Sequence, residues 1–521
     1  MTATRTDAAR LVPPARVAEL VALVRASGDE VKESVSPLDE SSLAAIPQST
    51  LADVDAAFAA ARTAQVAWAG LGASERGRRL LEFHDLLLAE QEQLADLVVT
   101  ETGKARRDAI EEVFHAAMTA RYYGVHAPAI LRTRRRLGAI PGLTRVDVQH
   151  VPKGVVGVIS PWNYPLTMGF SDGVAALAAG NTVVAKPDSQ TMLTALAGLE
   201  LLRRAGVPDD VWQVVAGPGP EIGMALVERA DYVTFTGSTA TGRKVAARAG
   251  ERLIGASLEL GGKNPMVVLD DADLASAVAG AVRGCYGNAG QLCVSFERVY
   301  VARAVFDEFR DRFVAATRDL DLTAGHDWSC DVGTLTSASR LEKVEAHVAD
   351  ARAHGATVLT GGRARPDLAP WSYEPTILAG VTPAMDLYRD ETFGPVVALY
   401  PFDTDDEAVE LANDSVFGLN ASVWSRDHRR ARAVAFRIRA GSVNINESIA
   451  ASFGSLTAPM GGFGDSGLGR RQGPEGLLRF TETQTVATQR GMRLDAPPGV
   501  SREKFADVMT GALRMMRRLR L

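Results

Sequence analysis

Cysteine is scarce in this 521-residue chain, which contains only Cys285, Cys293 and Cys330. So few cysteines in so long a chain argue against a disulfide framework and favour a reducing compartment. No apolar run approaches the ~20 residues that a membrane span needs. The first residues, Met1 to Arg5, are not followed by an apolar core, so no secretory signal is expected. The sequence therefore predicts a cytoplasmic protein.

Positive charge is also in short supply. The chain has 57 lysines and arginines against 63 acidic residues, a net charge of −6. This balance gives no electrostatic case for nucleic-acid binding. The basic run from Arg132 to Arg136 invites that interpretation, but an isolated basic turn on an acidic protein is more typical of a solvated face or a subunit contact. Internal repeats and low-complexity segments are absent as well.

What is present is a pattern of strands and helices in a chain long enough for two or three domains. Residues 51–123 have helical periodicity, and buried strands then alternate with helices. The expected strands are residues 155–159, 181–187, 212–216, 232–236 and 265–269. Such alternation predicts a parallel sheet with helices on both faces. Ligands bind at the carboxyl ends of such strands, where Lys186, Gly237 and Ser238 are expected. A second α/β region begins near residue 299.

Three distant stretches carry residues whose chemistry makes sense only if they converge. Asn163 lies in Pro-Trp-Asn-Tyr-Pro, Glu259 opens Glu-Leu-Gly-Gly-Lys-Asn-Pro, and Cys293 ends Asn-Ala-Gly-Gln-Leu-Cys. They supply an amide donor, a carboxylate base and a thiol nucleophile. A thiolate attacks a carbonyl carbon, and the resulting thiohemiacetal can expel a hydride and leave a thioester. The three stretches therefore indicate oxidation of an aldehyde.

From about residue 40 to about residue 490 the chain closely resembles the aldehyde dehydrogenase superfamily, in these stretches and in their order. The resemblance implies an α/β fold with a Rossmann-type cofactor domain, an α/β catalytic domain and a small oligomerisation β-element, assembled as a homodimer or homotetramer. The expected units are an N-terminal arm with a short helix (1–40), the cofactor-binding domain (41–289, with 140–152 in the oligomerisation element), the catalytic domain (290–478), an oligomerisation strand (479–495) and an amphipathic C-terminal helix (500–521).

The resemblance also assigns the catalytic roles. Cys293 is the expected nucleophile, and Glu259 the base that activates the water that hydrolyses the thioester. Relatives that pass the acyl group to coenzyme A typically lack this glutamate, so its presence favours release of a free acid. The amide of Asn163 and the backbone N–H of Cys293 are the expected oxyanion donors. Cys285 and Cys330 lack such a setting and are expected to be structural.

Cofactor binding is expected to involve several loops, and no metal. Gly237 and Ser238 begin a turn that approaches the pyrophosphate at a helix N-terminus. The residues expected nearer the nicotinamide are Trp162, Asn163, Leu260, Glu391 and Phe393.

The choice of cofactor depends on Lys186, Pro187, Asp188 and Ser189. NAD-preferring relatives commonly carry a glutamate three residues after this lysine, and here that position is Ser189. A carboxylate ~4 Å from a 2′-phosphate would cost on the order of 4 kcal/mol per charge pair at an effective dielectric of about 20. The loop therefore predicts NADP, with NAD accepted less well, although Asp188 could approach the same phosphate.

The substrate is less constrained. Within the superfamily the strongest resemblance is to bacterial NADP-dependent enzymes that oxidise succinate semialdehyde. Several of these hold the substrate carboxylate with two arginines, at positions that are Ser171 and Gly287 here. Ser455 could match their substrate-binding serine. The resemblance makes succinate semialdehyde the expected substrate. The two missing arginines favour the alternative, a less polar aldehyde with succinate semialdehyde only tolerated, unless a basic residue from another loop restores the carboxylate preference.

Two other classes of function compete with aldehyde oxidation. A non-catalytic descendant would usually have lost Cys293 or Glu259, and both are present. A thiol-dependent esterase would need no nicotinamide site.

The C-terminal segment, with Phe505 and Val508 on one helical face and several arginines near its end, could lie on a membrane surface. Docking on a partner subunit is favoured.

Overall fold

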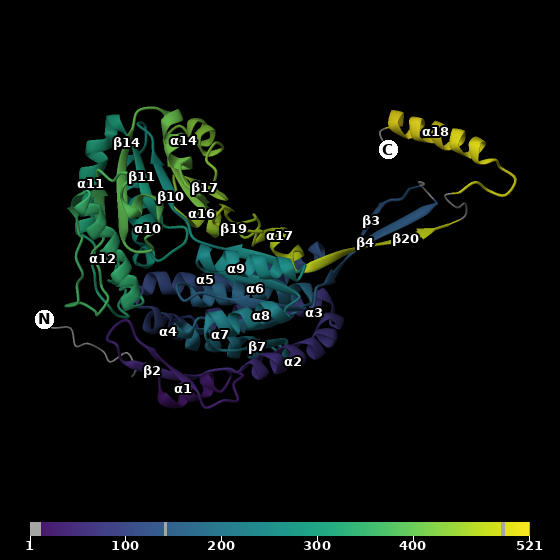
Figure 1. Ribbon diagram of the computed structural model, residues 1–521, viewed down its shortest axis with the longest axis horizontal. Helices are drawn as coiled ribbons and strands as arrows, with labels where there is room; N and C mark the ends of the chain where they lie inside the picture. Colours follow the sequence, from purple (N-terminus) through teal and green to yellow (C-terminus); the bar gives the residue numbers. More distant parts are fainter. Residues whose placement is uncertain (1–11, 140–142, 491–494, 520–521) are drawn as a thin grey trace.

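Two mostly parallel sheets, each with helices on both faces, form the body of the protein, and a slender arm extends from it (Figure 1). The computed structural model describes residues 12–139, 143–490 and 495–519. In the described part of the chain no helix is both long enough and apolar enough to cross a membrane.

The first sheet contains the strands expected between residues 155 and 236. Its order is β19 (Gly467–Leu468), β9 (Gly255–Glu259), β8 (Tyr232–Thr236), β5 (Val155–Ile159), β6 (Thr182–Lys186) and β7 (Trp212–Val214). All neighbours from β9 to β7 are parallel, and the short β19 joins β9 antiparallel. Because side chains alternate along a strand, Val155 packs toward one face whereas Val156 and Val158 pack toward the other.

Helices cover both faces of this sheet. On one side lie α2 (Leu51–Gly70), α8 (Met224–Arg229) and α9 (Thr239–Glu251). On the other lie α6 (Pro165–Ala179) and α7 (Met192–Arg204), and behind them α3 (Gly72–Ala89), α4 (Gln91–Thr102) and α5 (Arg106–Ile130). Every residue of α6 is buried, so this helix is a central element of the core.

The second sheet has the order β12 (Thr357–Thr360), β13 (Thr376–Ala379), β14 (Val396–Phe402), β11 (Phe296–Ala302), β10 (Asn264–Val268), β16 (Asn420–Trp424) and β17 (Ser442–Ile445). Helices α10 (Leu274–Tyr286), α11 (Phe306–Arg318) and α12 (Ala338–Ala353) pack on one face, and α14 (Asp405–Asn413) and α15 (His428–Ala435) on the other. Strand β10 was expected in the first sheet, and that expectation is wrong. It pairs with β11 and β16 of the second sheet.

The described part of the expected N-terminal arm packs on the body. Helix α1 (Pro14–Val21) lies against α7, where Arg16 forms an ion pair with Glu200. Strands β1 (Val31–Val35) and β2 (Ser42–Pro47) then form a hairpin. The boundary expected at residue 40 therefore falls inside one packed unit, and residues 1–11 lie outside the described residues.

The projecting arm is a separate sheet of β20 (Thr481–Gln489), β4 (Thr144–Pro152) and β3 (Arg134–Leu137) (Figure 1). The basic run at Arg132 to Arg136 contributes to the exposed edge strand β3. Helix α18 (Arg502–Leu519) follows, and none of its residues is buried. Of the segments expected here, residues 140–142, 491–494 and 520–521 lie outside the described residues.

Candidate active site

Asn163, Glu259 and Cys293 line one pocket between the two sheets. Asn163 follows β5, Glu259 ends β9, and Cys293 precedes β11. The same pocket is lined by the expected cofactor residues Trp162, Gly237, Ser238, Leu260, Glu391 and Phe393. Residues Lys186 to Ser189 lie outside its lining, at the end of β6. The pocket therefore brings together the three candidate catalytic side chains and the cofactor residues expected around the nicotinamide.

A buried ion pair that sequence reasoning missed holds Asn163 in place. Lys104 Nζ lies 2.5 Å from Glu112 Oε1 and donates to the carbonyl oxygen of Asn163 at 2.6 Å. The other oxygen of Glu112 accepts the backbone N–H groups of Leu166 and Thr167, at 3.0 and 3.3 Å, in the first turn of α6. The carboxylate thus satisfies donors that a helix N-terminus leaves unpaired. Backbone and helix are fixed together, and this orients the Asn163 amide.

Cys293 follows a turn whose backbone is strained. Asn288, Ala289 and Gly290 all have positive φ, of 51°, 53° and 71°. The left-handed region is unfavourable for the first two residues, and Gly290 could carry no side chain because its Cβ would lie 2.1 Å from the carbonyl oxygen of Gly394. Such strain persists where surrounding structure imposes it and is often found at functional sites.

Two further contacts fix the backbone of Cys293 itself. Asn264 Nδ2 donates to the Cys293 carbonyl oxygen at 2.7 Å. Gly262 passes so close that an added Cβ would lie 2.6 Å from that oxygen. A glycine at position 262 is therefore required for close packing of the Glu259 segment on the Cys293 segment.

Burial of the pocket places Glu259 close to neutrality and holds Cys293 as a neutral thiol. Burial raises the pKa of Glu259 to about 7, against a lowering influence from Arg471. Burial raises the pKa of Cys293 to about 12, with Glu259 and Glu391 adding to the rise and Arg471 opposing it. Glu259 Oε1 has no hydrogen-bond partner among the described residues. A carboxyl with a pKa near neutrality is well matched to general-base work.

The loop that carries Glu391 and Phe393 is held by a second buried ion pair. Glu297 lies 2.5 Å from Lys263 and accepts the backbone N–H of Phe393 at 2.9 Å. Glu391 Oε1 accepts the N–H of Gly262 at 2.8 Å, and burial raises the pKa of Glu391 to about 7. The Phe393 ring meets Trp162 edge-on at 5.7 Å.

The loop at the end of β6 combines two positively charged side chains with a neutral residue. Lys186 is buried, and its pKa is lowered first by burial and further by the nearby Lys32, which sequence reasoning also missed. The Asp188 carboxylate accepts the N–H of Gln190 at 3.0 Å and so caps the following turn. Ser189 is buried and uncharged. Two lysines and the neutral Ser189 favour a phosphorylated ribose here, against the charge of Asp188, which opposes the lowering of the Lys186 pKa.

Three basic side chains line the pocket: Arg340 lies over the Trp162 ring, Lys343 donates to the Glu391 carbonyl oxygen at 2.6 Å, and Arg471 lies among apolar side chains. The pocket walls include Tyr164, Met168, Leu292, Phe453 and Met460, together with Arg471. Ser171, Gly287 and Ser455 lie outside this lining. Arg471 was not predicted, because it lies in the glycine-rich stretch near residue 467, whose spacing does not reveal what it approaches.

The chain is similar to known proteins over most of its length. A family signature described as the aldehyde dehydrogenase family matches residues 23–486. A Mycolicibacterium smegmatis protein named "Putative succinate-semialdehyde dehydrogenase, NADP(+)" is 48% identical over 505 residues, which cover 97% of this chain and 98% of that protein. A Mycobacterium tuberculosis protein with the same name and the number 2 is 50% identical over 458 residues, 88% of each chain. The crystal structure of an NAD-dependent aldehyde dehydrogenase from Sinorhizobium meliloti superposes with a TM-score of 0.87 at 36% identity, covering 92% of this chain and 94% of that one.

Proposed function

The chain belongs to the aldehyde dehydrogenase family, and from that premise we propose that it oxidises succinate semialdehyde to succinate with NADP, through a thioester on Cys293. The observation that carries the proposal is the shared pocket, in which a thiol, a carboxylate and an amide donor from three distant segments face one space. The names of its mycobacterial relatives support the substrate and the cofactor.

The first step forms a carbon–sulfur bond. Glu259 takes the thiol proton of Cys293, and the sulfur attacks the aldehyde carbon. The aldehyde oxygen gains negative charge and accepts hydrogen bonds from Asn163 Nδ2 and the backbone N–H of Cys293. Asn163 Nδ2 has one hydrogen on the Gln291 carbonyl oxygen, at 2.9 Å, which leaves its second hydrogen for the substrate.

The second step is hydrolysis of the thioester. When bound, the nicotinamide supplies the acceptor for the hydride that leaves the former aldehyde carbon. Once the thiol proton has passed from Glu259 to solvent, Glu259 takes a proton from water, whose oxygen attacks the thioester carbon. The carbon–sulfur bond then breaks to release the acid, and the leaving Cys293 thiolate takes the proton from Glu259. The buried position of Glu259 keeps its pKa near 7, so that a useful fraction is ionised at neutral pH.

Cofactor choice follows from the loop at the end of β6. The residues that would hold the 2′-phosphate are Lys186, Ser189 and Lys32, and the charge of both lysines favours a dianion. In the same cofactor site, Gly237 and Ser238 would meet the pyrophosphate at the N-terminus of α9, where Ser238 is the capping residue. Trp162, Leu260, Glu391 and Phe393 would surround the nicotinamide ribose and ring.

The two sheets have different roles in the proposed enzyme: the first would bind the cofactor, and the second would carry Cys293. The protein would be a cytoplasmic homodimer or homotetramer. The arm supports this assembly, because almost all of β20 is exposed and a small sheet without a buried face has little stability of its own. Helix α18 would dock on a second copy through its apolar face, where Val508 and Leu513 are exposed.

Steady-state oxidation of succinate semialdehyde, followed as NADPH absorbance, tests the function. Cys293→Ala should abolish turnover while binding of NADP, measured by fluorescence quenching, remains. Appreciable NADPH formation by this variant would overturn the covalent mechanism. Hydrolysis of an activated ester without NADP, in a protein that forms no NADPH from any aldehyde, would favour an esterase instead.

A further inference from the structure

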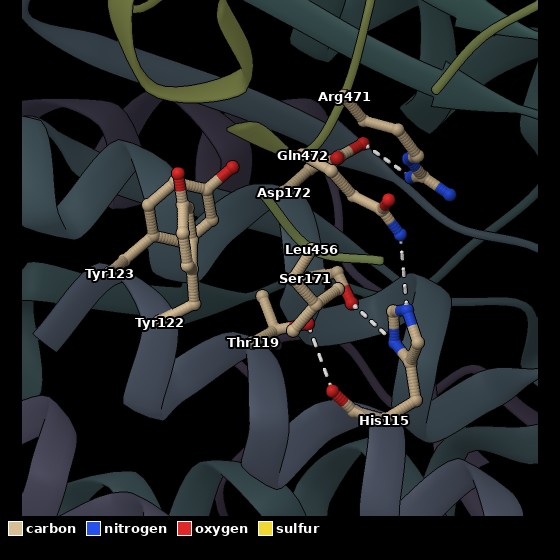
Figure 2. A pocket seen from close by; sticks show the side chains of 9 residues that line it. All are labelled: His115, Thr119, Tyr122, Tyr123, Ser171, Asp172, Leu456, Arg471 and Gln472. Carbon is tan, nitrogen blue, oxygen red and sulfur yellow. Dashed lines mark hydrogen bonds and ion pairs between the residues drawn. The ribbon is translucent and has the colours of Figure 1, made fainter. Parts of the chain in front are cut away.

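A buried cluster of two arginines and one carboxylate adjoins the substrate side of the pocket. Arg471 NH2 donates to Asp172 Oδ2 at 2.8 Å, and Arg479 NH2 donates to Asp172 Oδ1 at 2.6 Å. Figure 2 shows the first of these contacts beside the cavity that Arg471 shares with His115 and Gln472. Because two guanidinium groups share one carboxylate, the cluster carries a net positive charge.

The hydrogen-bonding capacity of this cluster is only partly used. Within the described residues, Arg471 Nε has no partner, and neither do Nε and NH1 of Arg479. Arg471 NH1 meets only the sulfur of Met168, at 2.8 Å, and a thioether is a weak acceptor. Arg471 is 5% exposed, so water does not readily supply the missing partners. A buried cation with unused donors is costly unless an anion joins it.

Among the residues that the structure describes, no second anion is bonded to the cluster. Glu259 is near enough for Arg471 to lower its pKa, but no hydrogen bond joins the two side chains in the part of the chain that the structure describes. Burial and the charge of Arg471 lower the pKa of His115 to about 3, so this neighbour is neutral. Despite burial, the two arginines hold the pKa of Asp172 at about 2, so the cluster keeps its charge at neutral pH.

Arg471 reaches this place from a segment that is fixed on both sides. Its backbone N–H and carbonyl form a two-way bridge with Met460, at 2.7 and 2.8 Å. Gln472 follows with φ 60° and ψ 174°, a conformation rare for a residue with a side chain. Met168 and Asp172, four residues apart on α6, form the surface on which the guanidinium lies.

Arg471 lies close to the position at which the resemblance places a substrate-binding arginine in several relatives. That position is Ser171 here; it lines the cavity of Figure 2 together with Arg471, and its hydroxyl lies 3.5 Å from His115 Nδ1. A guanidinium is therefore present in the same neighbourhood, but it comes from the segment after β19 rather than from α6.

We propose that Arg471 binds the carboxylate of the substrate, with Asp172 and Arg479 as the residues that position it. The inference rests on the proposed function and specifies its substrate class: aldehydes with a carboxylate a few carbons from the carbonyl. The methylene groups would lie against the apolar walls formed by Tyr164, Met168 and Phe453.

The test compares succinate semialdehyde with butanal, an uncharged aldehyde of the same length. In Arg471→Gln the ratio of the two kcat/KM values should fall about tenfold to hundredfold, as expected for loss of a charge-assisted contact. Arg471→Lys should retain part of the ratio because it keeps the charge without the fork. Arg470→Gln, a neighbour outside the pocket lining, is the matched control and should leave the ratio unchanged.

The ratio separates substrate binding from an effect on the catalytic groups. If Arg471 acted only by lowering the pKa of Glu259 and Cys293, both aldehydes would lose efficiency equally and the ratio would stay at its wild-type value, which would overturn the inference. Wild-type protein that oxidises neither aldehyde would instead refute the proposed function.

A measurement on the wild type covers the case in which the glutamine variant does not fold. Succinate should protect Cys293 from alkylation by iodoacetamide at concentrations at least about tenfold lower than butyrate, because one end of each acid can occupy the oxyanion site while only succinate has a second carboxylate for Arg471. Equal protection by the two acids would contradict the proposal.

Discussion

Replacing Lys104 with methionine should damage both stability and catalysis, because this side chain joins two buried groups. Lys104 and Glu112 have no exposed side-chain surface, and the same ammonium holds the carbonyl of Asn163 at 2.6 Å. Removing one partner of a buried ion pair leaves an uncompensated charge and typically costs about 3–5 kcal/mol. We expect Lys104→Met to lose that much free energy of unfolding.

Catalysis should fall as well, by a smaller amount. The Asn163 carbonyl keeps its bond from Asn288 Nδ2 at 3.1 Å, so the turn persists with one donor fewer. Complete loss of an oxyanion donor costs about 2.7–4 kcal/mol. A displaced but present amide should lose part of this, which predicts a roughly tenfold to hundredfold decrease in kcat/KM.

The double variant Lys104→Met with Glu112→Gln is the control. Glutamine has a carbonyl oxygen that can still accept the N–H groups of Leu166 and Thr167, while no unpaired charge remains, so stability should largely return. Activity should stay low, because Asn163 still lacks the lysine.

Urea unfolding and steady-state kinetics on the same preparations measure both effects. Burial already raises the pKa of Glu112, and Lys104 opposes the rise. The folded single variant therefore binds the Glu112 proton more tightly than the unfolded chain does, so its stability defect should shrink as the pH is lowered. A defect below about 1 kcal/mol, or wild-type kcat/KM in Lys104→Met, would refute this account of how Asn163 is positioned.

Three further predictions concern the pocket. Glu259→Gln should slow deacylation so that an acyl-enzyme accumulates, seen by intact mass after mixing with aldehyde and NADP; deacylation at the wild-type rate would require another base. In the wild type, kcat/KM should rise with pH through an apparent pKa near 7, because the ionised form of Glu259 is the active one and burial raises its pKa to that value; a profile flat across neutrality would contradict this. Ser189→Glu should reduce kcat/KM with NADP far more than kcat/KM with NAD. Lys32→Ala should also reduce kcat/KM with NADP, but by less than Ser189→Glu does. A wild type that prefers NAD tenfold, about 1.4 kcal/mol, would contradict the assignment of this loop to the 2′-phosphate.

The parts of the fold and site that sequence could predict are those written in local patterns. Strands β5, β6 and β8 appear as short apolar runs, and the stretches around Asn163, Glu259 and Cys293 contain the residue types that their chemistry needs. The pocket contains all three side chains. Local pattern cannot assign a strand to a sheet, however, because a buried run looks the same wherever its partners lie. That is why β10 was expected in the wrong sheet.

The residues that sequence reasoning missed act across long separations. Lys104 lies 59 positions before Asn163, and Arg471 lies 303 positions after Met168. Neither Lys104 nor Arg471 is part of a motif with recognisable spacing, and from the sequence each could equally be a solvated surface charge. Only the packing of α5 and α6, and the return of the chain through β19 to β9, brings them to the pocket.

The strained turn before Cys293 makes the position of the thiol depend on distant parts of the chain. Ala289 occupies a conformation that costs about 1–3 kcal/mol, so local preference does not favour the turn. Partners from elsewhere hold it, among them Asp108 on α5, whose carboxylate accepts the Asn288 N–H at 2.9 Å across 180 positions of the sequence. Correct placement of the Cys293 thiol is therefore a property of the assembled fold rather than of the segment that carries it.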